Sequence, residues 1–157
     1  MPSVLFVCTA NVCRSPMAEA ILRAKVEEEG PSNWRVESAG TWALVDRPAA
    51  DFSQQVMAER GLDISDHRSR VVSKEILDRF DLILTMEAGH KEALKAEFPE
   101  CADRVYMLTE LVGIQRDIDD PIGRSKEDYR ATADEIGRLL TEGLEELRRL
   151  ARKRHSE

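Results

Sequence analysis

The chain has 157 residues and a formal net charge of −7 at neutral pH. Its length favours one folded domain, residues 1–157, and its acidity argues against general nucleic-acid binding. No apolar run approaches the roughly eighteen residues that span a bilayer, and no basic signal region precedes the first apolar segment, so we expect a cytoplasmic protein without a membrane partner.

Strand-like and helix-like patterns alternate along the chain. Short apolar runs predict strands at residues 3–7, 34–39, 80–85 and 104–108. Apolar residues at helical spacing predict helices at residues 15–29, 49–60, 73–79, 87–98 and 126–152. This alternation predicts an α/β fold: a single-domain, doubly wound, four-stranded parallel sheet with helices on both faces. Such sheets bind ligands beyond the carboxyl ends of their strands, and Cys8 follows the first strand at that end.

The loop between the first strand and the first helix has the composition of an anion site. It begins at Cys8 and reaches Arg14 and Ser15, where the helix is expected to open. The NH groups of the helix start and of the tight loop, together with the forked guanidinium of Arg14, suit a phosphate. The same positive potential favours the thiolate of Cys8, which is the nucleophilic form. Ser15 is placed either to donate to that thiolate or to cap the helix.

At these residues the chain resembles the low-molecular-weight protein tyrosine phosphatases. The resemblance includes the signature of Cys, five residues, Arg and Ser, the neighbouring residues up to 19, the segment 37–41 and an Asp120-Pro121 pair. It implies a hydrolase that removes phosphate from tyrosine through a cysteinyl-phosphate intermediate at Cys8, without a metal or other cofactor. It also implies a phosphate-binding loop that consists of Thr9, Ala10, Asn11, Val12, Cys13 and Arg14.

Cleavage of a phosphate ester also needs a proton donor for the leaving oxygen. Asp117, Asp119 and Asp120 are the clustered candidates. A residue before proline is held in an extended conformation, which fixes the direction of its side chain and favours Asp120. The resemblance selects the same residue, because the general acid of the family is the aspartate of an Asp-Pro pair. Asp119 is the second choice.

Asn11 and His67 are the candidates for supporting the loop. Asn11 lies in mid-loop, where asparagine tolerates a left-handed backbone and bonds to neighbouring main chain. The resemblance implies that this asparagine shapes the loop with the help of a histidine, and His67 matches that histidine in position. His90 and His155 are expected to be exposed residues of a helix and of the tail. Scattered histidines without a cysteine pair at ligand spacing predict no metal site.

The three cysteines are too few for a disulfide scaffold, which agrees with a reducing compartment. Cys13 has two interpretations. It is a small apolar loop side chain or, as the resemblance implies, a redox partner that forms a reversible disulfide with oxidised Cys8. Cys101 has acidic neighbours that disfavour a thiolate, so we expect it to have a structural role.

Three residues at the rim of the loop bear on the choice of substrate. Family members that prefer phosphotyrosine carry aromatic residues after the Asp-Pro pair, where this chain has Ile122. Trp42 is placed either to form the opposite wall for a flat ring or to cover the edge of the core. Val12 occupies a position where the resemblance associates threonine with arginine phosphatases and a larger aliphatic residue with tyrosine phosphatases. Phosphotyrosine is the leading expectation, and phosphoarginine is the alternative.

Two other functions would use a similar loop. Thioredoxin-coupled arsenate reductases share it, but they relay oxidation to further cysteines, and here only Cys101 is available. A non-catalytic module that binds phosphoproteins would keep Arg14 and lose the nucleophile or the acid, whereas Cys8 and Asp120 are both present. The expected partner is a phosphorylated protein substrate, and the enzyme is expected to be a monomer or a weak dimer.

Overall fold

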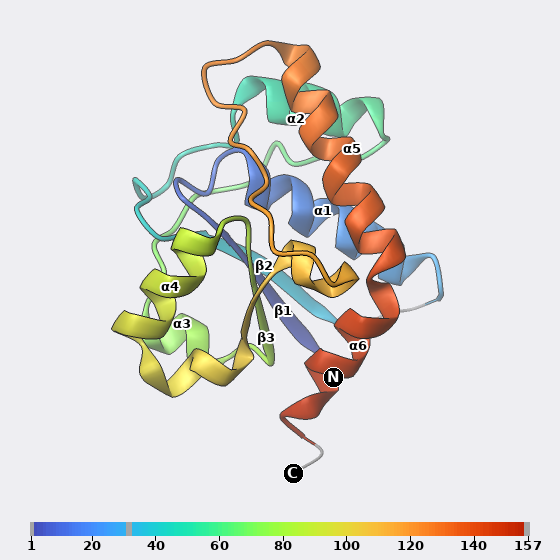
Figure 1. Ribbon diagram of the computed structural model, residues 1–157. Coiled ribbons are helices and arrows are strands. Elements are labelled where there is room, and N and C mark those ends of the chain that lie inside the picture. Colours follow the sequence, from blue (N-terminus) through green and yellow to red (C-terminus); the bar gives the residue numbers. More distant parts are fainter. Residues whose placement is uncertain (1, 31–32, 156–157) are drawn as a thin grey trace.

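A four-stranded parallel sheet forms the centre of the computed structural model, which describes residues 2–30 and 33–155 (Figure 1). The strands are β1 (Ser3–Cys8), β2 (Arg35–Gly40), β3 (Leu82–Thr85) and β4 (Val105–Met107), in the order β2-β1-β3-β4. Every neighbouring pair is parallel. The predicted α/β fold with a parallel sheet is confirmed.

Helices cover both faces of the sheet, as Figure 1 shows. They are α1 (Arg14–Glu27), α2 (Asp51–Glu59), α3 (Lys74–Asp78), α4 (Ala88–Glu97), α5 (Lys126–Glu142) and α6 (Leu144–Lys153), with the 3-10 segments η1 (Pro99–Arg104) and η2 (Leu108–Val112). Val4 and Phe6 of β1 pack into the apolar cluster shared with α1, α2, α5 and α6, whereas Leu5 and Val7 pack into the cluster shared with α3 and α4. All of β1 is buried, as expected for a strand covered on both faces.

Most of the predicted elements lie within two residues of their expected ends. Such differences are normal, because the ends of helices and strands are the least sharply defined parts. The expected serine cap of α3 is present, since the Ser73 side chain accepts a hydrogen bond from the Ile76 NH. This cap satisfies one of the NH groups that the start of a helix leaves without an intrahelical partner.

The prediction of one continuous helix at residues 126–152 is wrong, because the chain bends at Gly143 between α5 and α6. Gly143 lies against η2, where an added Cβ atom would come within 2.6 Å of the Leu111 Cβ. A residue with a side chain would push these segments apart. The bend therefore depends on a close tertiary contact that helical periodicity in the sequence does not reveal.

The carboxyl ends of β1 and β3 lie side by side where the strand order reverses. The chain passes from β1 to β2 on one side, while β3 and β4 lie on the other, so this edge is the usual ligand-binding position of a doubly wound sheet. Cys8 ends β1, and Glu87 follows β3 by two residues. Over residues 2–30 and 33–155, no helix has the length and apolar character needed to cross a membrane.

Candidate active site

Residues 8–15 join β1 to α1 and include the loop predicted to bind phosphate, so this segment is called the phosphate loop below. Cys8 is buried at its start, and the Cys8 Sγ lies 3.0 Å from the Ser15 Oγ. The Ser15 hydroxyl accepts a hydrogen bond from the Asn11 amide, so its own hydrogen is available to the sulfur. The N-cap residue of α1 is Cys13, and its side chain makes no cap hydrogen bond. Of the two predicted positions for Ser15, the structure shows the one beside Cys8.

Asn11 lies in the middle of the phosphate loop with a left-handed backbone, φ 59°. Its Nδ2 donates to the hydroxyls of Ser15 and Ser38 over 2.8 and 2.9 Å, and its Oδ1 accepts from the Arg70 NH over 3.0 Å. His67 Nε2 donates to the Asn11 carbonyl over 2.7 Å, since a carbonyl oxygen is only an acceptor. The structure therefore brings Asn11 and His67 together and ties the loop to β2.

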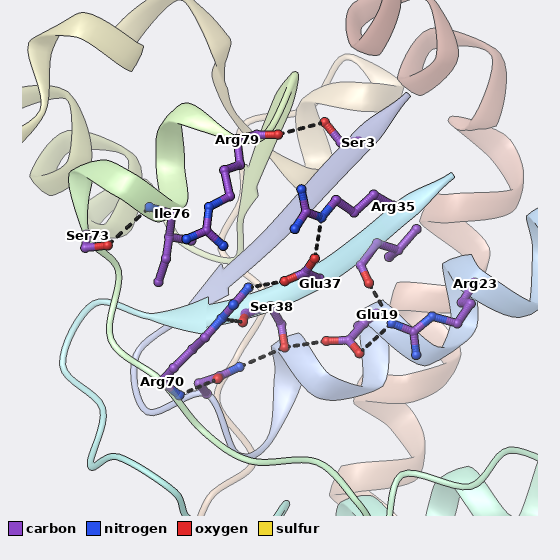
Figure 2. A network of polar contacts seen from close by, with 12 residues as sticks. Ser3, Glu19, Arg23, Arg35, Glu37, Ser38, Arg70, Ser73, Ile76 and Arg79 are labelled. Carbon is purple, nitrogen blue, oxygen red and sulfur yellow. Dashed lines mark hydrogen bonds and ion pairs between the residues drawn. The ribbon is translucent and has the colours of Figure 1, made fainter. Parts of the chain in front are cut away.

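A charged network extends this support behind the loop (Figure 2). Ser38 on β2 donates to Glu19 of α1 over 2.7 Å, and Arg70 donates to Glu37 over 2.7 Å and to the Ser38 carbonyl over 3.0 Å. Burial would raise the pKa of Glu37, but hydrogen bonds from Arg35 and Arg70 hold it below its ordinary value. These contacts fix the loop backbone before a ligand binds, which reduces the entropic cost of binding.

Arg14 is a buried cation that is held along one edge. Its Nη1 donates to Glu87 Oε2 over 2.5 Å and to the Ile118 carbonyl over 2.6 Å, and its Nη2 lies 3.5 Å from Asp120 Oδ2. Within the described part of the chain, its buried Nε has no hydrogen-bond partner. A buried donor without an acceptor costs about 1–3 kcal/mol. The site therefore favours an anion that accepts hydrogen bonds from this guanidinium.

The side chains of the three candidate acids make different contacts. Asp120 Oδ2 contacts Arg14, and Asp120 Oδ1 accepts from the main-chain NH two residues later over 3.1 Å. Asp117 Oδ1 accepts instead from the Ala88 NH at the start of α4, over 2.8 Å. Asp119 is exposed and lines a separate surface hollow over α5. Contact with Arg14 singles out Asp120 among these three described side chains.

Two residues at the start of α4 complete the surroundings of the phosphate loop. Glu87 pairs with Arg14, and His90 Nε2 lies 2.9 Å from Thr9 Oγ1. The expectation that His90 is exposed is wrong, because it is 6% exposed and its burial lowers its pKa. No local motif marks Glu87 and His90. Their proximity follows from the parallel sheet, since both come after β3 at the edge where Cys8 ends β1.

The cysteines other than Cys8 are buried thiols. Cys13 Sγ lies 3.5 Å from the Tyr129 hydroxyl on α5, and burial raises the pKa of Cys13 to about 11. Cys101 packs in the cluster on the opposite face of the sheet. Burial is the largest cause of its raised pKa, ahead of the acidic neighbours that the sequence suggests. No disulfide joins any of the three cysteines, which all lie in described segments.

The rim residues differ in exposure. Trp42 is 84% exposed and Ile122 is 55% exposed, whereas Val12 is half-buried in the phosphate loop. Trp42 therefore does not cover the edge of the core. The main-chain NH of Trp42 donates to the Thr9 carbonyl over 2.9 Å, which holds the segment after β2 beside the loop.

Among the residues that the structure describes, no group of three or more His, Cys, Asp or Glu could hold a metal ion.

A parallel α/β sheet with a cysteine, an arginine and a tight loop at the end of its first strand is the arrangement expected of the phosphatase family that the sequence resembles. The chain matches the family described as low molecular weight phosphotyrosine protein phosphatase over residues 3–154. It belongs to this family.

Curated relatives include phosphatases named for two substrates. The chain is 39% identical over 145 residues to a protein-arginine-phosphatase of Geobacillus stearothermophilus, covering 92% of this chain and 95% of the relative. It is 38% identical over 129 residues to the low molecular weight protein-tyrosine-phosphatase Wzb of Escherichia coli, covering 82% and 84%. A solved low molecular weight protein tyrosine phosphatase from T. tengcongensis is 41% identical with a TM-score of 0.88, covering 93% of this chain and 99% of that one.

Proposed function

We propose that this family phosphatase hydrolyses phosphotyrosine in proteins through a cysteinyl-phosphate intermediate. The observation that carries the proposal is the set of hydrogen bonds that the Arg14 guanidinium makes and leaves unmade. Glu87 and a main-chain carbonyl hold its Nη1, while its buried Nε has no partner within the described residues. A guanidinium fixed in this way presents its remaining NH groups as a fork for two oxygens of a phosphate. Cys8 lies on the same short loop.

In the proposed first step, the Cys8 thiolate attacks phosphorus and the bond from phosphorus to the tyrosine oxygen breaks. The protonated carboxyl of Asp120 gives its proton to that oxygen, so tyrosine leaves as a neutral phenol. Arg14 and the NH groups of the phosphate loop stabilise the charge on the phosphoryl oxygens. The products of this step are free tyrosine in the protein and phosphorylated Cys8.

In the proposed second step, the Asp120 carboxylate takes a proton from water, and the water oxygen attacks phosphorus. The bond between sulfur and phosphorus breaks, inorganic phosphate leaves, and Cys8 returns to the thiolate. Ser15 stabilises that thiolate because its hydroxyl hydrogen is available at 3.0 Å. The positive charge needed in both steps comes from Arg14 and the loop, so we expect activity to be insensitive to metal chelators.

The position of Trp42 suits phosphotyrosine as a substrate. Its indole is exposed, while its main-chain NH anchors it beside Thr9. A large flat side chain at the rim suits stacking on the phenol ring of a phosphotyrosine bound at Cys8. Ile122 adds an exposed apolar side chain two residues after Asp120.

Phosphoarginine is the second candidate, because the relative that matches 92% of the chain is a protein-arginine-phosphatase. The same two steps would break a phosphorus–nitrogen bond, with Asp120 giving its proton to the guanidine nitrogen. An exposed indole also stacks on a planar guanidine group. Trp42 alone therefore does not decide between the two substrates.

A paired assay tests the proposal. The value of kcat/KM is measured on one peptide sequence that carries either phosphotyrosine or phosphoarginine at the same position, and we expect faster turnover of phosphotyrosine. Faster turnover of phosphoarginine would refute phosphotyrosine as the preferred substrate and leave the proposed mechanism intact. Cys8→Ser should abolish turnover of both peptides and of p-nitrophenyl phosphate, whereas the control Cys101→Ala should retain it. A wild type without turnover would favour a phosphoprotein-binding module.

We also propose that the enzyme works in the cytoplasm on phosphorylated proteins. A reducing compartment supports this location, because Cys8 must be a free thiol to act as the nucleophile.

A further inference from the structure

The first turn of α4 carries a capping box in which a histidine stands where glutamate or glutamine is more common. The Glu87 side chain accepts a hydrogen bond from the His90 NH. In return, His90 Nδ1 accepts from the Glu87 NH over 3.2 Å. A ring nitrogen that accepts a hydrogen bond carries no proton, so the Nδ1 of His90 is unprotonated.

The other ring nitrogen of His90 must therefore carry the proton of a neutral imidazole. His90 Nε2 lies 2.9 Å from Thr9 Oγ1 and donates to that hydroxyl. Burial of the ring lowers its pKa, which favours the neutral imidazole. The tautomer thus follows from the main-chain contact at Nδ1, and it determines the direction of the hydrogen bond to Thr9.

Thr9 follows Cys8 directly and is held from two sides. Its carbonyl accepts from the Trp42 NH over 2.9 Å. The same carbonyl lies so close to β2 that a Cβ atom added to Gly40 would come within 2.5 Å of it. On the other side, the Thr9 hydroxyl accepts from His90. Movement of Thr9 in either direction would break one of these contacts.

We propose that His90 is a positioning residue of the phosphatase site: through an imidazole protonated at Nε2, it holds Thr9 and thereby the direction of the Cys8 sulfur. Glu87, the other member of the capping box, holds Arg14 over 2.5 Å. One helix terminus therefore fixes both the start and the end of the phosphate loop. The inference rests on the proposed function, because it requires Cys8 to be the nucleophile.

His90→Asn and Thr9→Val each remove one partner of the hydrogen bond between His90 Nε2 and Thr9 Oγ1. Asparagine keeps an acceptor near the Nδ1 position, and so keeps the cap of α4, but it is too short to donate to Thr9. Valine keeps the branched shape of threonine and removes the acceptor. In each variant we expect kcat on p-nitrophenyl phosphate to fall about tenfold, with KM within about twofold, because the lost bond positions the reacting sulfur. His90→Gln, whose longer side chain reaches the Nε2 position, should restore kcat to within about threefold of wild type.

The double variant Thr9→Val/His90→Asn separates positioning from independent damage. Because both changes remove the same contact, the double variant should be no slower than the slower single variant. Losses that multiply, or single variants with wild-type kcat, would overturn the proposal. His155→Asn is the matched control, since it removes a histidine contact with Asp81 at the opposite end of β3 and should leave kcat unchanged.

A measurement that does not depend on turnover distinguishes failure of this inference from failure of the proposed function. Nitrogen-15 NMR of the imidazole at neutral pH should show a proton on Nε2 and none on Nδ1 of His90. Thr9→Val should shift the Nε2 signal more than the Nδ1 signal. If the wild type is active but His90 is an imidazolium, or carries its proton on Nδ1, the positioning role of His90 is refuted and the proposed function stands. A wild type without turnover would overturn the proposed function and the positioning role together.

Discussion

Replacing Glu87 by glutamine should reveal how strongly the site depends on one ion pair. Arg14 is 1% exposed, and its Nη1 lies 2.5 Å from a Glu87 side chain that is 32% exposed. Glutamine retains an oxygen that can accept the α4 cap bond, but it removes the negative charge that faces Arg14. The substitution therefore tests the charge rather than the helix cap.

The expected loss of stability follows from the burial of the two partners. Removing one partner of a fully buried ion pair costs about 3–5 kcal/mol, because the other charge is left buried without compensation. Here the partial exposure of Glu87, the Ile118 carbonyl at 2.6 Å and Asp120 at 3.5 Å reduce the cost. We expect the free energy of unfolding to fall by about 2 kcal/mol. Because Arg14 is then less firmly held, kcat/KM should fall by roughly tenfold to a hundredfold.

Urea unfolding and the kinetics of p-nitrophenyl phosphate hydrolysis measure the two effects of Glu87→Gln. The control is Asp78→Asn, which breaks an exposed pair with Lys74 at 2.8 Å and should cost under about 0.5 kcal/mol. If Glu87→Gln is no less stable than Asp78→Asn and keeps kcat/KM near the wild-type value, Glu87 does not hold the guanidinium and the reasoning fails.

Four further substitutions, one of them a control, test other parts of the structure. Asp120→Ala should slow phenyl phosphate by roughly a hundredfold or more and p-nitrophenyl phosphate far less, because a good leaving group needs no proton; equal losses would argue against Asp120 as the acid. Gly143→Ala places a Cβ atom 2.6 Å from the Leu111 Cβ and should cost about 1–3 kcal/mol of unfolding free energy. Gly89→Ala, with open space around its Cβ position, should cost nothing, and equal stability of the two variants would contradict the packing explanation. Burial raises the pKa of Cys13 from 9.0 to about 11, so the folded protein keeps a proton that the unfolded chain releases between these values. Relative to Cys13→Ala, unfolding free energy should be constant below pH 9 and fall above it by at most about 1.4 kcal/mol per pH unit; a flat difference up to pH 10.5 would show that the thiol is not perturbed.

The parts of the fold that the sequence predicts correctly are those with strong local patterns. The apolar run of β1 has no polar face because the strand is buried on both sides. The start of α3 is likewise a local signal, since the Ser73 side chain accepts a hydrogen bond from the Ile76 NH, three residues later. The bend at Gly143 is different, because a glycine inside a periodic helical pattern is tolerated at a cost of only about 1 kcal/mol. Its cause is the approach of Leu111, which is distant in the sequence.

The same distinction applies to the candidate site. Cys8, Asn11 and Arg14 lie within one short loop, and their spacing between a predicted strand and a predicted helix indicates an anion site. Glu87 and His90 come more than seventy residues later, and α4 gives them an ordinary helical context. They reach the loop because parallel strands bring their carboxyl ends to one edge. The order of the strands therefore carries information about the site that residue motifs do not contain.

The arrangement around Arg14 also bears on how the proposed acid acquires its proton. Asp120 Oδ2 lies 3.5 Å from Arg14 Nη2, so in the free protein this carboxylate neutralises part of the guanidinium charge. A phosphate dianion that binds to the same guanidinium competes with Asp120 for it. Two neighbouring negative charges favour protonation of one of them, and the carboxylate is the group beside the leaving oxygen in the proposed first step. Substrate binding would thus convert Asp120 from a counter-ion of Arg14 into a proton donor. When phosphate leaves, Asp120 releases to solvent the proton that it took from water, and its carboxylate pairs with Arg14 again, which returns the site to its starting charge state.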